Sequence, residues 1–289
     1  SQTLQRLHRA KRVGMTDRYA VFGNPIAHSK SPLIHTAFAE QTRQDLLYER
    51  QLVEPNKFAE TTRHFFANGG CGLNITVPFK LEAFELVDVL SERAAAAGAV
   101  NTLKKMPDGK IYGDNTDGAG LLRDITQNLG WIIRGKRVLL LGAGGAVRGV
   151  IAPLLAEQPS RVVIANRTLE KAEALVKDFS VGKSAQEIKL LRASSLQIHA
   201  RPFDIVINGT SASLQGAMPD LDPAILNPNA CCYDMMYGTE LTPFLQWAQR
   251  HGAQVADGLG MLVEQAAESF YLWRGVRPET KAVMEWLRA

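Results

Sequence analysis

Two charged side chains, Lys80 and Asp117, each follow a predicted strand. Lys80 ends the stretch Asn74-Ile-Thr-Val-Pro-Phe-Lys80, directly after an apolar strand at residues 72–77. Asp117 ends the polar run 114–117, which follows another predicted strand and precedes a glycine. Ligands of open α/β sheets gather at the carboxyl ends of the strands. Both side chains are therefore expected at a ligand site.

A lysine beside a carboxylate has the chemistry needed to reduce a ketone or to run the reverse reaction. When hydride reaches a ketone, negative charge builds on the oxygen, and an ammonium group can stabilise this charge and donate the proton. A neighbouring carboxylate orients the ammonium and holds its charge. Two simpler interpretations stay open: Lys80 lies on a solvated helix face, or Asp117 only caps the following helix. We expect Lys80 to be largely exposed.

Short polar side chains occur at similar positions. Ser29 and Ser31 lie in a polar loop between the first predicted strand and the first predicted helix, and Thr76 lies at the end of the third strand. Their hydroxyls suit a ligand that itself carries several hydroxyl groups. Ser31, which is followed by Pro32, is equally typical of a helix N-cap.

A glycine-rich loop in the second half of the chain predicts a dinucleotide site. The aliphatic strand Val138–Leu141 is followed by Gly142, Gly144 and Gly145 and then by an apolar helical pattern. The glycines therefore stand at a helix N-terminus, where unpaired N–H groups and the helix dipole bind phosphate. Val147 departs from the G-x-G-x-x-G/A pattern, and a glycine turn without a ligand is the simpler alternative.

The residues after the next strand, Val162–Ala165, indicate which dinucleotide binds. Proteins that bind NAD usually have an acidic side chain here for the ribose 2′-hydroxyl, but this chain has Asn166-Arg167-Thr168. A cation beside two small hydrogen-bonding groups suits a 2′-phosphate. We therefore predict NADP(H) as the cofactor.

The order of the predicted elements indicates an α/β fold with two domains. Strands and helices alternate through the first hundred residues, which predicts a parallel α/β substrate domain, and they alternate again from residue 118. We place the substrate domain at 15–117 together with 258–289, because the last two helices are expected to pack back on it. A Rossmann-type NADP domain occupies 118–257, and the active cleft is expected between the two domains. The predicted strands are 19–23, 46–53, 72–77, 99–103, 111–113, 138–141, 162–165, 204–211 and 230–237, and the predicted helices are 33–38, 57–68, 91–98, 119–129, 147–155, 170–179, 244–251, 261–273 and 278–287.

Composition and charge argue against several classes of protein. The 289-residue chain is 46% hydrophobic and 21% charged, as in ordinary globular proteins, and it has no apolar run as long as a membrane span. Its formal charge of +4 comes entirely from residues 1–14, which we expect to be a basic leader or extension, so we predict no nucleic-acid partner. The three cysteines lack metal-ligand spacing, which favours a reducing cytoplasm and predicts no metal site.

Seven motifs, taken together and in order, resemble those of the shikimate dehydrogenase family, NADP-dependent enzymes that interconvert 3-dehydroshikimate and shikimate. Their joint occurrence over nearly the whole chain is far more specific than any one motif. The family's glycine loop also has a non-glycine residue at its third position, which accounts for Val147. The motifs are Ser29-Lys-Ser31-Pro, Asn74-Ile-Thr76-Val-Pro-Phe-Lys80, Ala99-Val-Asn101-Thr, Asn115-Thr-Asp117-Gly, Gly142-Ala-Gly-Gly-Ala146, Asn166-Arg-Thr168 and Met261-Leu-Val-Glu-Gln265-Ala.

The resemblance implies a reaction and a role for individual residues. The reaction is the reversible NADPH-dependent reduction of 3-dehydroshikimate in aromatic amino-acid (chorismate) biosynthesis, with Lys80 and Asp117 as the catalytic pair. We predict that the enzyme acts on small molecules as a monomer or homodimer. The substrate cleft is lined by Ser29, Ser31, Thr76, Lys80, Asn101, Asp117, Tyr237 and Gln265. The cofactor is contacted by Glu92, Gly142, Ala143, Gly144, Gly145, Ala146, Asn166, Arg167, Thr168, Leu169, Glu170, Lys171, Met235 and Gly258.

Three other interpretations compete with this one. A quinate/shikimate dehydrogenase that prefers NAD shares the cleft, but an acidic residue is expected just after Asn166-Arg167, and often Thr in place of Ser31. A non-catalytic NADP-binding regulator has no need of Lys80 and Asp117 together with the cleft hydroxyls. A ligand-binding scaffold without a nucleotide is disfavoured by the glycine loop.

Overall fold

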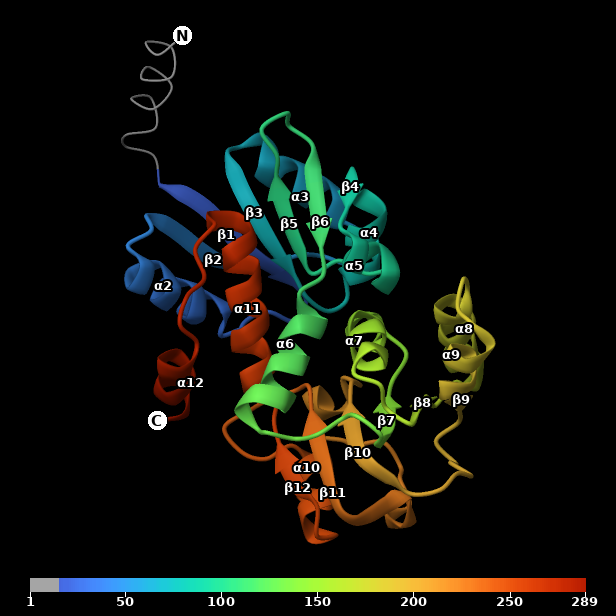
Figure 1. The fold of residues 1–289 in the computed structure, drawn as a ribbon. Coiled ribbons are helices and arrows are strands. Elements are labelled where there is room, and N and C mark those ends of the chain that lie inside the picture. Colours follow the sequence, from blue (N-terminus) through green and yellow to red (C-terminus); the bar gives the residue numbers. More distant parts are fainter. Residues whose placement is uncertain (1–15) are drawn as a thin grey trace, which may run out of the picture.

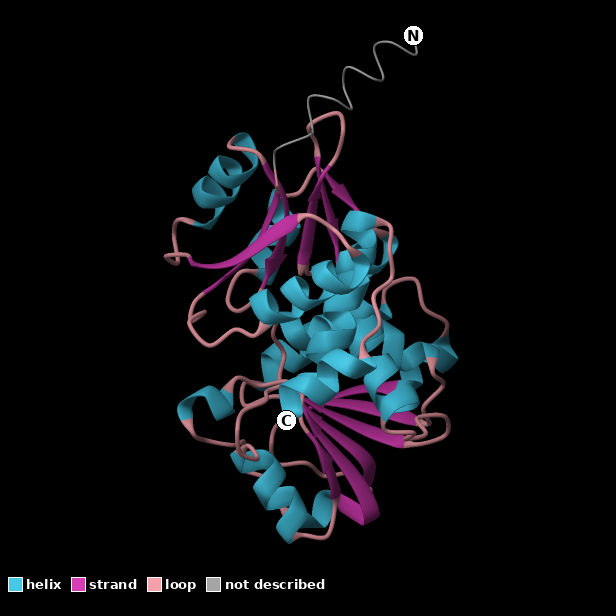
Figure 2. Ribbon diagram, turned by 90° about the vertical axis from the view of Figure 1, so that its left-hand side faces the viewer, coloured by secondary structure: helices cyan, strands magenta, loops and turns pink. Residues whose placement is uncertain are grey.

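The computed structural model describes residues 16–289, which form two α/β units, each built on a six-stranded sheet (Figure 1). The predicted leader at residues 1–14 lies outside the described residues. Figure 2 shows the two sheets at opposite ends of the molecule, with helices between them. None of the helices formed by residues 16–289 has the length and hydropathy needed to span a bilayer.

The first sheet is mixed and has the strand order β2–β1–β3–β5–β6–β4. Its β2–β1–β3 part is parallel, as predicted, whereas β5 runs antiparallel to both β3 and β6. The chain reverses between β5 and β6 at the predicted turn Pro107-Asp108-Gly109. The short strand β4 was not predicted. The strands are β1 (Asp17–Gly23), β2 (Leu46–Leu52), β3 (Gly70–Ile75), β4 (Val89–Leu90), β5 (Thr102–Lys105) and β6 (Ile111–Asp114).

The second sheet is parallel throughout and has the order β12–β11–β10–β7–β8–β9. Leu140 of the central strand β7 pairs with Ile207 of β10 on one side and with Ile164 of β8 on the other. These strands read as unbroken aliphatic runs because both faces of a parallel sheet are covered. The edge strands β9 and β12 are short and were not predicted. The strands are β7 (Arg137–Leu141), β8 (Arg161–Ala165), β9 (Leu191–Ser194), β10 (Phe203–Asn208), β11 (Leu226–Asp234) and β12 (Gln254–Ala256).

Most helices were predicted, and the exceptions are short. The sequence did not predict α4 or α9, and a π-helical turn at Asp124–Asn128 extends α6. The helices are α2 (Ser31–Thr42), α3 (Phe58–Ala67), α4 (Lys80–Leu86), α5 (Glu92–Ala97), α6 (Asp117–Arg123), α7 (Gly145–Ala156), α8 (Leu169–Ser180), α9 (Ala185–Leu190), α10 (Pro243–Arg250), α11 (Leu259–Arg274) and α12 (Lys281–Arg288).

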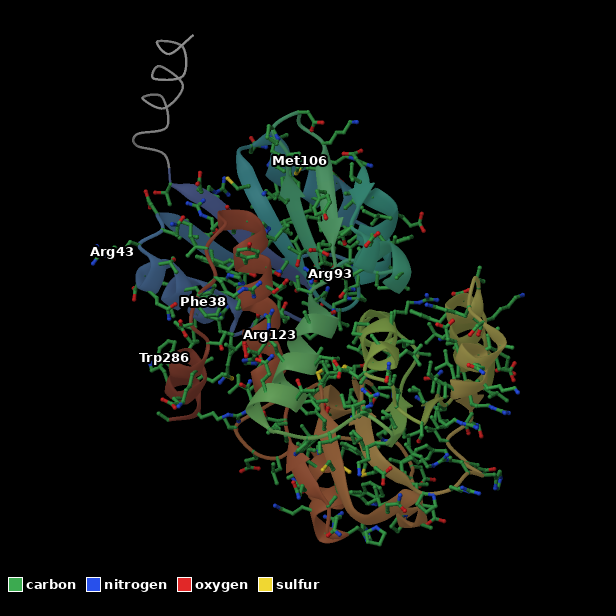
Figure 3. All side chains as sticks on the ribbon, in the orientation of Figure 1. Phe38, Arg43, Arg93, Met106, Arg123 and Trp286 are labelled. Atoms are coloured by element: carbon green, nitrogen blue, oxygen red, sulfur yellow. The ribbon has the colours of Figure 1, made fainter. Side chains whose placement is uncertain are left out.

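The last two helices pack against the beginning of the chain. Phe38 of α2, labelled in Figure 3, lies in one apolar cluster with Phe270 of α11 and Val283 of α12. By contrast, Leu121 and Ile125, in and just after α6, belong to the core of the second unit. Helix α11 therefore returns the chain to the first unit after the second sheet has been completed, and it runs beside α6 where the two units meet (Figure 1).

Candidate active site

Lys80 and Asp117 form a buried ion pair. Nζ of Lys80 donates to Oδ2 of Asp117 at 2.7 Å, and the two side chains are 13% and 6% exposed. The expectation that Lys80 is largely exposed is wrong, because Gly145 of α7 packs on its aliphatic stem; a Cβ added to Gly145 would lie 3.1 Å from Cβ of Lys80. The N-cap of α6 is Thr116. The Asp117 carboxylate therefore pairs with a cation instead of capping the helix.

Two amide side chains complete a cluster around this pair. Nδ2 of Asn101 lies 3.0 Å from Oδ1 of Asp117 and 3.2 Å from Oε1 of Gln265. Both amide residues are buried, Asn101 just before β5 and Gln265 on α11. We call Lys80, Asn101, Asp117 and Gln265 the Lys80 cluster. Four residues predicted separately, which lie up to 185 positions apart in the sequence, thus come into hydrogen-bonding contact.

The other predicted substrate residues lie at the ends of β1, β3 and β11. Ser31 is the first residue of α2, and the N-cap position is occupied by Lys30, whose side chain makes no capping bond. The alternative that Ser31 serves as the helix N-cap is therefore wrong. Oγ of Ser29 instead accepts from the backbone N–H of Ser31 at 3.3 Å. Thr76 directly follows β3. The ring centre of Tyr237 lies 5.9 Å from Nζ of Lys30, and burial raises the pKa of this tyrosine. Among the described residues, none of these side chains hydrogen-bonds to the Lys80 cluster.

The glycine loop has the geometry of a phosphate-binding turn. Gly142 has a φ of +109°, which disfavours any residue with a Cβ. Gly144 precedes α7 and has open space around its Cβ position, so a ligand can approach the backbone there. Val147 is fully buried, and room for it is made by Gly209, where a Cβ would lie 2.5 Å from Cγ2 of Val147. Valine is thus tolerated at the third position of the glycine pattern because Gly209, which follows the neighbouring strand β10, leaves space for its side chain.

The remaining predicted cofactor residues lie in four places. Arg167 and Thr168 are exposed between β8 and α8, and Leu169, Glu170 and Lys171 form the first turn of α8. Nδ2 of Asn166 donates to the backbone oxygen of Thr168 at 2.9 Å. Met235 and Gly258 touch through their backbones at the end of β11. Ala143 and Ala146 pack on the core of the second unit, and Glu92 is exposed at the start of α5.

Sequence reasoning missed Gly149. A Cβ at this position would lie 2.9 Å from Oδ1 of Asn115 and 3.2 Å from Cβ of Asp117. The glycine therefore lets α7 pack directly on the turn that carries Asp117. The signal that could have revealed it is a glycine inside a helical pattern, four residues after Gly145, because such a glycine often marks a close approach of another segment.

Sequence reasoning also missed an ion-pair cluster behind this turn. Asp114 is 3% exposed and accepts from Nε and Nη2 of Arg93, both at 2.7 Å, and from Oγ of Ser91 at 2.6 Å. Burial raises the pKa of Asp114, but the bonds from Arg93 and Ser91 outweigh burial and hold this pKa below its usual value. Arg93 and Arg123, both labelled in Figure 3, also donate to Glu268 of α11 at 3.2 and 3.1 Å.

Comparison with known proteins places the chain in a family. Family models match residues 21–103 (shikimate dehydrogenase substrate binding domain), 124–216 (shikimate / quinate 5-dehydrogenase) and 258–288 (shikimate 5′-dehydrogenase C-terminal domain). A shikimate dehydrogenase (NADP(+)) of Cellvibrio japonicus is 62% identical over 276 residues, which are 95% of this chain and 98% of that protein. The chain belongs to the shikimate dehydrogenase family. This confirms the predicted family, and NADP(+), the predicted cofactor, appears in the names of these relatives.

Solved structures of the family have the same two-unit fold. An Ael1 enzyme from Pseudomonas putida has a TM-score of 0.85 at 50% identity, covering 95% of this chain and 99% of that one. A shikimate 5-dehydrogenase from Thermus thermophilus, in complex with NADP(H) and shikimate, has a TM-score of 0.82 at 32% identity, covering 94% and 99%. The predicted fold class is therefore confirmed. A 5-ketofructose reductase of Gluconobacter also reaches a TM-score of 0.78 at 28% identity, so the fold alone does not select the substrate.

Proposed function

We propose that this protein catalyses the reversible NADPH-dependent reduction of 3-dehydroshikimate to shikimate, a step of aromatic amino-acid biosynthesis, with Lys80 and Asp117 as its catalytic pair. The observation that carries the proposal is the buried 2.7 Å ion pair packed directly against the glycine loop. This contact puts a proton donor beside the start of α7, the helix whose N-terminus has the geometry to bind a dinucleotide. The substrate and cofactor named for the relatives support the assignment.

In the proposed mechanism Lys80 acts on the substrate oxygen and Asp117 holds Lys80 in place. NADPH, when bound, supplies the hydride. The Lys80 ammonium stabilises the charge that develops on the substrate oxygen and donates a proton to it, and it takes the proton back in the reverse direction. Asp117 accepts a hydrogen bond from the ammonium and another from Asn101, which holds both groups in place. Because both side chains are almost excluded from water, their electrostatic interaction with the substrate is strengthened.

The second unit has the features that NADP requires. The α7 N-terminus would offer unpaired N–H groups to the pyrophosphate, and Gly144, which has open space at its Cβ position, would let the ligand approach the loop Gly142 to Ala146. The exposed guanidinium of Arg167, with Asn166 and Thr168 to Lys171, would hold the 2′-phosphate. We assign Met235 and Gly258 to contacts with the cofactor and Glu92 to a contact near its nicotinamide side.

The first unit would bind the substrate. Ser29, Ser31, Thr76, Asn101, Tyr237 and Gln265 offer hydroxyl and amide groups that match the hydroxyls and the carboxylate of shikimate. We propose that this domain comprises 15–117 and 258–289 and that the NADP domain comprises 118–257, which accords with the packing of α11 and α12 on α2. A cytoplasmic location and a monomeric or dimeric state stay predictions.

The test is steady-state kinetics of Lys80→Met, followed as NADPH absorbance with shikimate and NADP. Methionine keeps the apolar stem and removes the ammonium, so turnover should fall by roughly 10²–10⁴-fold, the usual scale for a positioned acid or base. The Michaelis constant for shikimate should change much less, because several other groups share ground-state binding. Lys57→Met, at a 59% exposed side chain, is the control and should keep wild-type turnover.

The buried pair adds an expectation about stability. Lys80→Met leaves the Asp117 carboxylate buried without its cation, so the melting temperature should fall as well. Asp117→Asn preserves the shape and is the second variant, and it should also lose turnover. Near-wild-type turnover in both variants would remove the pair from the catalytic role.

A further inference from the structure

A buried network of hydroxyl and amide side chains lies behind Asp117. Its members come from β2, β3, the segment 101–102, the residue before α6, and α11, and none is more than 6% exposed. Water therefore cannot replace a lost partner in this network. Apart from Asn101, none of these residues has a role in the proposed reaction. The members are Tyr48, Asn74, Asn101, Thr102, Thr116 and Ser269.

The network determines which way the Asn101 amide points. The backbone N–H of Thr116 lies 2.9 Å from Oδ1 of Asn101. A backbone N–H can only donate, so the atom that faces it must be the amide oxygen. Nδ2 of Asn101 is then the atom that faces Asp117, at 3.0 Å from Oδ1 of the carboxylate. An inverted amide would place its oxygen against the carboxylate, where two acceptors repel each other.

The hydroxyl protons of two further residues can be placed in the same way. Oγ1 of Thr102 lies 2.8 Å from Oδ1 of Asn101, which has no proton to give, so Thr102 must donate to it. Its single proton is then used, and the contact of 2.8 Å between Thr102 and Ser269 requires Ser269 to donate. Both hydroxyls are therefore held in one direction by the groups around them.

The chain of donors continues to a buried tyrosine. Nδ2 of Asn74 faces the backbone oxygen of Asn101 at 3.3 Å, which can only accept, and it also donates to Oγ of Ser269 at 3.2 Å. Oδ1 of Asn74 accepts from the hydroxyl of Tyr48 at 2.7 Å. One chain of donors can thus be followed from Tyr48 through Asn74, Ser269, Thr102 and Asn101 to the carboxylate of Asp117. Nδ2 of Asn101 also donates to Oγ1 of Thr116 at 2.8 Å. Such chains strengthen their members by mutual polarisation.

The two stacked rings at the far end of this chain are uncharged. The Tyr48 ring stacks on His35, with ring centres 4.3 Å apart and planes 8° from parallel. Burial lowers the pKa of His35 to about 3, so the imidazole is neutral at working pH. Burial likewise raises the pKa of Tyr48 well above its usual value, so the phenol stays protonated and can donate.

We infer that Thr102 and Ser269 are positioning residues, which fix the Asn101 amide so that one of its N–H groups faces Asp117 and holds this carboxylate against Lys80. Both side chains are 0% exposed, so they would act through Asn101 and not by contact with substrate or cofactor. Ser269 also ties the network to α11, one turn after Gln265. The inference rests on the proposed function of the Lys80–Asp117 pair.

The test compares two substitutions of the same kind in buried threonines. Thr102→Val keeps nearly the same shape and removes the donor to Asn101. Thr62→Val is the matched control, because Thr62 of α3 is also 0% exposed and its hydroxyl has no hydrogen-bond partner within residues 16–289. Thr102→Val should lower kcat with shikimate by roughly 10–100-fold, the scale typical of groups that orient a reacting residue, and should leave KM for NADP unchanged. Thr62→Val should leave both constants unchanged.

Two further variants separate positioning from general stability. Thr102→Ser restores the hydroxyl and should recover most of the lost kcat. Ser269→Ala should lower kcat less than Thr102→Val, and the double variant should be no slower than Thr102→Val alone, because both changes interrupt one chain. Melting temperatures of all variants show whether a loss of kcat only follows a loss of stability.

Two results overturn the inference. One is a kcat for Thr102→Val equal to that of Thr62→Val. The other is a kcat loss that Thr102→Ser does not recover. If Lys80→Met still lowers turnover in the same assay, only this inference fails. If Lys80→Met also turns over normally, the proposed function fails with it.

Discussion

The ion pair between Arg93 and Asp114 makes a prediction about stability. Arg93→Met keeps the aliphatic stem but leaves Asp114, which is 3% exposed, without two of its hydrogen-bond donors. Removing one partner of a buried ion pair costs roughly 3–5 kcal/mol of unfolding free energy. The Arg93 side chain is 39% exposed, so water can replace part of the interaction. We therefore expect a loss at the lower end of this range, about 3 kcal/mol near neutral pH.

The expected loss depends on pH in a definite direction. Although burial alone raises the pKa of Asp114, the bonds from Arg93 and Ser91 hold it below the usual value of 3.8. A carboxyl group with a lowered folded-state pKa stabilises the fold above its unfolded pKa, and this contribution disappears as the pH falls through the folded value. The difference in unfolding free energy between wild type and Arg93→Met should be largest near neutral pH and should shrink below pH 3.8. Glu268, which Arg93 also contacts, acts in the same direction, because Arg277, Arg93 and Arg123 outweigh burial and lower its pKa.

The assay is denaturant unfolding of both proteins at a series of pH values from neutral down to about 3. Lys57→Met is the control, because Lys57 and Glu60 form an exposed pair with side chains 59% and 75% accessible. Such pairs contribute about 0–1 kcal/mol, so the control should unfold almost as the wild type does. The reasoning is refuted if Arg93→Met is no less stable than the control, or if its loss is equally large at every pH.

Two other predictions concern the cofactor site and the packing of α7. Arg167→Ala removes the cation that we assign to the 2′-phosphate, which NAD lacks. It should raise KM for NADP about 10–100-fold more than KM for NAD, and equal changes would show that Arg167 does not contact this phosphate. Gly149→Ala places a Cβ 2.9 Å from Oδ1 of Asn115 and 3.2 Å from Cβ of Asp117, so kcat should fall through displacement of the Asp117 turn. Alanine otherwise favours a helix over glycine by about 0.5–1 kcal/mol, and a more stable variant with unchanged kcat would contradict the expected clash.

Local sequence patterns were sufficient for the main strands and for the glycine loop. The aliphatic runs of β7 and β8 are long enough to show burial on both faces, and the glycines between them mark a turn at a helix N-terminus. The sequence also predicted that Lys80 and Asp117 follow strands. Short elements such as β4, β9, β12 and α4 were missed because a few residues carry too little periodicity to distinguish strand, helix and loop.

Only the tertiary structure decided how the site residues are held. Thr102 and Ser269 are 167 positions apart, and Arg93 and Glu268 are 175 apart, so no local pattern pairs them. The same holds for the burial of Lys80, which depends on the approach of Gly145 from the other unit. The sequence by itself determined which chemical groups stand at the ends of strands, because that follows from local periodicity. The hydrogen-bond partners of these groups and the orientation of the Asn101 amide depend on contacts between distant segments. The chain brings these segments together only when both units and α11 have packed.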